Sequence, residues 1–123
     1  MQNFEVIFYE KEDGSKPAAE FLRNVEPKMR VKAVRMLKIL EEKGKNLREP
    51  YSKHLDDGIF ELRVKFATDI SRILYFFVVD NKIIVTHGFI KKTQKTPPSE
   101  IERAKKYRED FFSRKEKDKN DAK

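Results

Sequence analysis

The side chains of this sequence that could do chemistry together are Arg63, Arg72, His87 and Lys91, which all fall within its most apolar stretch. Planar guanidinium groups bind phosphate oxygens bidentately. An imidazole ordinarily titrates close to neutral pH, so it can take or give a proton. A lysine can hold a phosphate, or act as a base when neighbouring cations crowd it. The set suits a phosphate-containing ligand if the fold gathers it on one surface.

The stretch 59–96 contains three runs rich in Ile, Val, Phe and Tyr, separated by short polar breaks at Ala67-Thr68 and Asp80-Asn81. Runs of this composition predict an antiparallel three-stranded meander. Asp and Asn tolerate the positive φ of a two-residue hairpin loop. If both breaks are such loops, counting gives three opposed pairs, which are Arg63 with Arg72, Leu74 with His87, and Ile70 with Lys91.

The alternation of side chains along the strands decides which of them share a face. Arg63, Arg72, His87 and Lys91 fall on one face, with direct and diagonal neighbours about 5 to 8 Å apart. The opposite face is expected to form a core from Phe60, Leu62, Val64, Ile73, Tyr75, Phe77, Ile84, Thr86 and Ile90. Apolar side chains also share the basic face, so we expect the C-terminal helix or a partner to cover Phe76, Val78, Ile83, Val85 and Phe89.

Two arginines directly opposite each other repel in a plain sheet, so the pairing of Arg63 with Arg72 needs an explanation. Either an anionic ligand binds between them, or each arginine pairs with Glu61 or with a carboxylate of a helix at the rim of the sheet. His87 has a comparable alternative to a chemical role, in which it packs beside a phenylalanine and hydrogen-bonds to the sheet.

The remaining segments predict a first strand and three helices around this meander. Residues 3–9 alternate like a strand, and residues 16–25 and 27–43 have helical periodicity, with Pro in each first turn and Gly44 as the stop of the second helix. Residues 46–58 predict a loop, and Thr96 is expected to cap a last helix beginning at Pro97. The fold class is therefore α+β, in the order β-α-α-β-β-β-α, as one domain over 1–112 with a charged, disordered tail over 113–123.

The composition favours an anionic partner, because the chain of 123 residues has a net charge of +7. The outer sides of the two predicted N-terminal helices are basic, which is typical of either a solvated face or a contact surface. There is no cysteine, the two histidines have no metal-like spacing, and no segment reaches membrane-spanning length. We expect a cytoplasmic protein with no metal, no cofactor and no membrane partner.

Three strings of the sequence, SKHLDDGIFELR, RILYFF and HGFIKKTQKTPPSEIERA, resemble the RelE/ParE superfamily, and within it the phage-derived Gp49-like, HigB-type toxins. The resemblance covers nearly the whole chain. It implies a type II toxin held inactive by a cognate helix-turn-helix antitoxin. RelE- and HigB-type members cleave mRNA in the ribosomal A site without a metal, whereas ParE-type members share the fold and poison DNA gyrase.

The resemblance also carries over individual residues. Arg63, Arg72, Lys91 and Lys92 match basic positions of the Gp49-like pattern, and His87 matches the histidine of its HGF string. We therefore expect Arg63 and Arg72 to hold the phosphate, and His87 or Lys91 to transfer protons. A wider basic set is expected to hold the RNA, namely Lys53, His54, Lys65, Lys92 and Lys95. The alternatives are a gyrase poison and a basic module that only binds nucleic acid.

Overall fold

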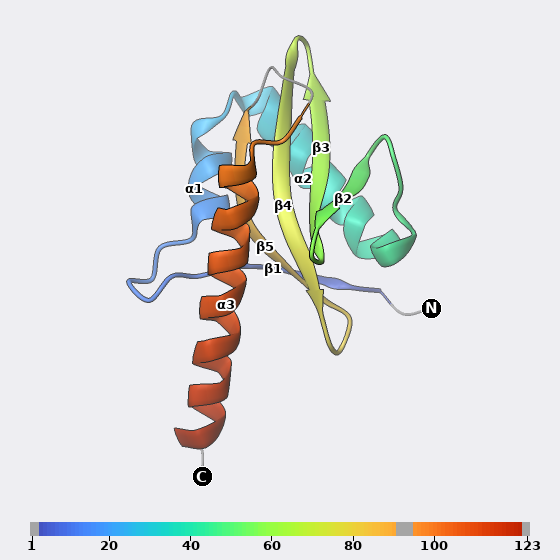
Figure 1. Cartoon of the computed structure of the whole chain (residues 1–123). Coiled ribbons are helices and arrows are strands. Elements are labelled where there is room, and N and C mark those ends of the chain that lie inside the picture. The colour runs from blue at the N-terminus through green and yellow to red at the C-terminus, as the bar shows by residue number, and fades with distance from the viewer. Residues whose placement is uncertain (1–2, 91–94, 122–123) are drawn as a thin grey trace.

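The computed structural model of the chain describes residues 3–90 and 95–121. Figure 1 shows a sheet with α-helices on both of its faces. The elements in chain order are β1 (Glu5–Phe8), α1 (Pro17–Asn24), α2 (Pro27–Lys43), the 3-10 helix η1 (Gly44–Asn46), β2 (Ser52–Asp56), β3 (Ile59–Phe66), β4 (Asp69–Val78), β5 (Lys82–Ile90) and α3 (Pro98–Asp121). The α+β class and the predicted elements are confirmed, and β2 is an addition to them.

The five strands form one mixed sheet in the order β1-β5-β4-β3-β2. Strands β2 to β5 make an antiparallel meander, and β1 pairs in parallel with β5. The extra strand β2 lies inside the predicted loop 46–58. Its sequence, SKHLD, is short and mostly exposed, as is common for an edge strand, so it lacks the apolar run by which the other strands are recognised.

Helices cover both faces of the sheet (Figure 1). Helices α1 and α2 pack on one face, where Leu22, Met29 and Leu40 meet Leu62 and Tyr75 in the larger core. Helix α3 packs on the other face, over a second cluster of Ile59, Leu74, Phe76, Ile84 and Ala104. The expectation that the C-terminal helix covers the apolar part of the basic face is therefore confirmed for Phe76, Val78 and Phe89, and it is wrong for Ile83 and Val85, which belong to the larger core.

The predicted register is correct where it matters for the arginines and wrong near the second hairpin. Arg63 lies opposite Arg72, and Leu74 lies opposite His87. However, Val78 pairs with Lys82, so the β4–β5 loop has three residues, and a bulge between Leu74 and Tyr75 restores the expected pairing. The Ile70–Lys91 pair lies outside the described residues.

The three-residue loop and the bulge reverse the predicted faces of the first part of β5. Ile83 and Val85 pack in the α1–α2 core, and Ile84 packs under α3. Thr86 does not extend the apolar core as predicted, because its hydroxyl donates to the carbonyl of Leu74. The bulge turns His87 toward α3, which is the face on which it was expected.

The helix boundaries follow local backbone chemistry. Both α1 and α2 begin at a proline, whose missing N–H costs nothing in a first turn. Gly44 ends α2 with φ of +52°, and a Cβ there would lie 2.1 Å from the ring of Phe4, so only glycine fits.

Helix α3 begins at Pro98, one residue later than predicted, and its helical backbone continues to Asp121. Arg114 in this part of the helix binds Asp110. Disorder of the predicted tail over 113–123 in solution stays a prediction. Within the described ranges, none of the helices has the length and apolar character that a membrane crossing requires.

Candidate active site

A pocket of about 620 Å³ lies where β2, β3 and β4 meet the segment that leads into α3. It is lined by Lys53, His54, Leu55, Glu61, Arg63, Ile70, Arg72, Lys95, Thr96 and Ile101. Five of the nine predicted site residues are therefore brought together, namely Lys53, His54, Arg63, Arg72 and Lys95. We call this the basic pocket.

The floor of the basic pocket is an ionic cluster centred on Glu61, whose side chain is fully buried. Nε of Arg63 and Nη1 of Arg72 each donate to Oε2 of Glu61 at 2.8 Å. The hydroxyl of Thr96 donates to the other carboxylate oxygen. The alternative in which Glu61 pairs with the arginines is thus the one the structure contains, and a single carboxylate serves both.

The two arginines differ in how far they can reach a ligand. The side chain of Arg63 is 27% exposed, and that of Arg72 is 3% exposed. Because two guanidinium groups share one carboxylate, the cluster carries one positive charge in excess. Arg63 is therefore the member that faces the pocket mouth, and Arg72 supplies charge from the floor.

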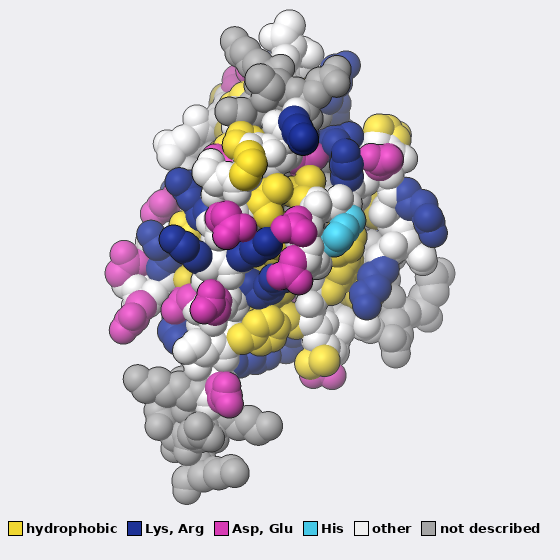
Figure 2. Space-filling view, in the orientation of Figure 1, with side chains coloured by type: hydrophobic (Ala, Val, Ile, Leu, Met, Phe, Trp, Pro, Cys, Tyr) yellow, Lys and Arg dark blue, Asp and Glu magenta, His cyan; other side chains and the backbone are white. Residues whose placement is uncertain are grey.

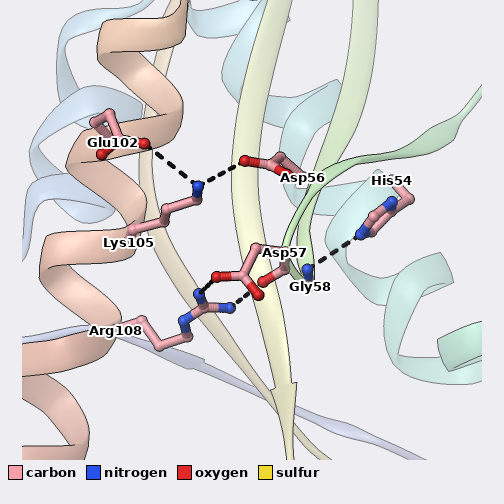
Figure 3. A network of polar contacts seen from close by, with 7 residues as sticks. All are labelled: His54, Asp56, Asp57, Gly58, Glu102, Lys105 and Arg108. Atoms are coloured by element: carbon pink, nitrogen blue, oxygen red, sulfur yellow. Dashed lines mark hydrogen bonds and ion pairs between the residues drawn. The ribbon is translucent and has the colours of Figure 1, made fainter.

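His54 lies at the edge of the pocket on β2, with its ring turned toward the β2–β3 turn (Figure 3). Its Nε2 accepts the backbone N–H of Gly58 at 3.1 Å, and the ring packs edge-on against Phe60 at 5.1 Å between centroids. Since an N–H can only donate, Nε2 carries a lone pair and the ring proton resides on Nδ1. The side chain is exposed.

Ion pairs from α3 fix the β2–β3 turn, which contains the Gly58 amide that His54 binds (Figure 3). Nζ of Lys105 lies 2.6 Å from Oδ2 of Asp56, and Arg108 binds both the carbonyl and, at 2.9 Å, the carboxylate of Asp57. The hydrogen bond from Lys105 lowers the pKa of Asp56. Acidic side chains with Lys and Arg among them are visible across this face of the molecule (Figure 2). Helix α3 therefore holds the turn in place.

His87 does not line the basic pocket. It is buried beneath α3, where Nε2 lies 3.1 Å from Oε1 of Glu100 and Nδ1 lies 3.1 Å from the Thr86 hydroxyl. Burial lowers the pKa of His87, and Glu100 opposes that shift. His87 therefore matches the predicted alternative to a chemical role, a packed and hydrogen-bonded histidine. Its ring packs under α3, beside Tyr107 as well as Phe89.

The other predicted site residues are placed separately. Lys65 is exposed on β3 and is not part of the pocket lining, and its carbonyl accepts from Nζ of Lys32. Lys91 and Lys92 lie outside the described residues.

Sequence reasoning missed the role of Thr96. We predicted that it caps the last helix, but its hydroxyl binds Glu61 and the helix begins two residues later. No spacing rule in the sequence indicates that contact, because it joins positions 35 residues apart.

The model of one protein family, described as Phage derived protein Gp49-like (DUF891), matches residues 20–109. The match extends from within α1 into α3 and includes β2 to β5, which supply most of the basic pocket. Strand β1 and the end of α3 fall outside it. No curated protein matches the chain.

Proposed function

The chain belongs to the Gp49-like family, a RelE/ParE-like toxin family, and from that premise we propose that it is a ribosome-dependent endoribonuclease that cleaves mRNA in the A site. Membership of a toxin family implies an antitoxin partner, which we propose to be a cognate helix-turn-helix protein. The observation that carries the enzymatic proposal is the basic pocket, where Lys53, His54, Arg63, Arg72 and Lys95 converge.

In the proposed reaction the arginines hold the scissile phosphate. Cationic donors aimed at the phosphate oxygens stabilise the charge that develops when a 2′-oxygen attacks phosphorus. Arg63 is the exposed donor, and Arg72 adds charge from below. Lys53 and Lys95 at the pocket wall hold the flanking phosphates of the RNA backbone.

Proton transfer is assigned to the pocket, and so to His54 in preference to His87. Nε2 of His54 has the lone pair that a general base needs, and the RNA 2′-OH would replace the Gly58 amide as its donor. The 2′-oxygen then bonds to phosphorus, the bond from phosphorus to the 5′-oxygen breaks, and a lysine ammonium of the pocket protonates the leaving oxygen. The products are a 2′,3′-cyclic phosphate and a 5′-hydroxyl. Lys91, predicted as an alternative base, lies outside the described residues.

Purified protein added to translating ribosomes tests this proposal. We expect mRNA cut at A-site codons, with 2′,3′-cyclic phosphate ends. Arg63→Ala is the matched inactive variant, because its side chain is partly exposed and its loss leaves Arg72 paired with Glu61. Arg72→Ala is unsuitable, since removing a buried partner of an ion pair typically costs about 3–5 kcal/mol.

Two outcomes would overturn the proposal. Intact mRNA together with inhibited supercoiling by DNA gyrase would make the protein a ParE-type toxin. Binding to RNA or DNA with intact mRNA, active gyrase and no growth arrest would make it a binding module. Cleavage that is equal in wild type and Arg63→Ala would leave the activity but remove the basic pocket from it.

A further inference from the structure

A second pocket, of about 570 Å³, lies where β3, β4, the β2–β3 turn and α3 meet. Its walls are aromatic and its polar side chains are cations. It is lined by Lys45, Gly58, Phe60, Phe76, Phe77, Arg108 and Phe112. We call it the aromatic pocket, and nothing in the proposed cleavage reaction uses it.

Phe112 is the aromatic residue of this pocket that is most open to solvent. Its side chain is 46% exposed, which is unusual for a phenylalanine. The rings near it, Phe76 and Phe111, meet it at 47° and 76°. Among the residues that the structure describes, no ring stacks face to face on Phe112, so its ring can take a flat partner.

Two cations lie beside the aromatic walls. Nζ of Lys45 is 5.5 Å from the ring centre of Phe77, and the guanidinium of Arg108 is 6.0 Å from that of Phe76. Aromatic rings combined with cations are how proteins hold single-stranded nucleic acid, because rings stack on bases and cations attract the backbone. Arg108 is also paired with the carboxylate of Asp57, so attraction of the RNA backbone falls mainly to Lys45.

The aromatic pocket is joined to the basic pocket through His54. The ring of His54, which belongs to the basic pocket, packs against Phe60 and accepts from the N–H of Gly58. Both Phe60 and Gly58 line the aromatic pocket. An RNA strand that leaves the basic pocket past His54 therefore arrives at the aromatic walls.

We propose that the aromatic pocket binds a base of the same RNA strand whose phosphate lies in the basic pocket, with the base stacked on Phe112. The inference rests on the proposed function in taking RNA as the substrate. Among the described residues, the lining adds no hydrogen-bonding side chain to the two cations. Stacking on an aromatic ring tolerates every base, so the pocket's selection between bases is weak. Its role is to fix the register of the strand relative to the scissile phosphate.

The test is binding of a short, single-stranded 2′-O-methyl RNA, which cannot be cleaved by 2′-OH attack, without ribosomes. The same oligonucleotide with one abasic position, moved along the strand, serves as the comparison. Removing the stacked base should weaken binding about tenfold in the wild-type protein, as expected for the loss of one base–aromatic stack. Phe112→Tyr should keep that difference, and Phe112→Leu should abolish it. Val31→Ala, at an exposed apolar position on α2, controls for a general effect of surface apolarity.

The outcomes separate the two proposals. Equal affinity for intact and abasic strands, at every abasic position, overturns base stacking even if mRNA is cleaved on ribosomes. If Phe112→Leu still binds the intact strand more tightly than the abasic strand, base stacking is also overturned. Leucine offers apolar contact without a ring to stack on, which is the kind of contact that a protein partner would use. Intact mRNA on ribosomes with a Phe112-dependent base contribution overturns the cleavage proposal alone.

Discussion

At the scale of single residues, the buried carboxylate of Glu61 determines how the two arginines are presented. The sequence raised the question of what lies between Arg63 and Arg72, and Glu61 is the anion that does so. A phosphate would need to share the same donors. The free protein therefore keeps the arginines together, at similar distances from one acceptor, before any ligand arrives.

Replacing Glu61 with glutamine tests that interpretation. Without the carboxylate, the buried guanidinium of Arg72 and the partly exposed guanidinium of Arg63 lose their shared counter-charge, which should cost about 3–5 kcal/mol of unfolding free energy. Inorganic phosphate should then bind between the two arginines and raise the melting temperature of Glu61→Gln. At a phosphate concentration of about a hundred times its Kd, the unfolding free energy should increase by about 2.7 kcal/mol. Thermal melts across a phosphate series measure this. Glu41→Gln is the matched control, since Glu41 accepts from the N–H of Val6 on another part of the molecule. An equal rise in both variants would contradict the interpretation.

The two histidines give a second prediction at this scale. Glutamine at position 54 can still accept from the Gly58 amide but cannot take a proton, so His54→Gln should lower cleavage by about 10²–10⁴-fold. His87→Gln should leave cleavage close to wild type, because His87 lies under α3 outside the pocket. Single-turnover cleavage on ribosomes separates the two. Loss of activity in His87→Gln at unchanged stability would return proton transfer to His87.

At the scale of elements, the apolar strands could be predicted from the sequence, whereas the bulge between β4 and β5 could not. The run from Ile59 to Phe66 and its pairing with β4 followed from alternation and a tight loop. The bulge after Leu74 could not be predicted, because Thr86 is as compatible with a regular strand as with a bulge. Two errors, in the loop length and in the bulge, cancelled at His87. Arg63 and Arg72 depended on neither, so their common face was predicted correctly.

The attachment of α3 to the sheet predicts a pH dependence of stability. The folded-state pKa of His87 is lowered, chiefly by burial, while Glu100 raises it and Arg103 lowers it. Below about pH 6.5, where an ordinary histidine takes up a proton, the unfolded chain binds a proton that the folded chain resists. The unfolding free energy should therefore fall as the pH drops from about 7 to 5, by at most about 1.4 kcal/mol per unit for this group. Denaturant unfolding of His87→Gln should show a shallower slope, and identical slopes would contradict the assignment.

At the scale of the whole molecule, the net charge of +7 does not say which surface meets RNA. From the sequence, the basic outer face of α2 could be either a contact surface or a solvated face. The structure shows Lys28, Lys32, Arg35 and Lys38 exposed along that helix, while the basic pocket lies across the sheet from it. If RNA binds at the pocket, the cations of the pocket displace counterions from the RNA phosphates, and the cations of α2 do not.

The salt dependence of RNA binding decides between these surfaces. For single strands, the slope of log affinity against log salt is about −0.7 for each phosphate neutralised. Replacing both Lys53 and Lys95 with alanine should make the slope less steep by about 1.4, with affinity reduced most at low salt. Replacing Lys28 and Lys38, an equal charge change on α2, should leave the slope unchanged. Anisotropy titrations of a labelled 2′-O-methyl RNA over a salt series measure both. Equal changes in the two double variants would mean that RNA wraps the whole molecule, and a change in the α2 variant alone would move the RNA path to the helical face.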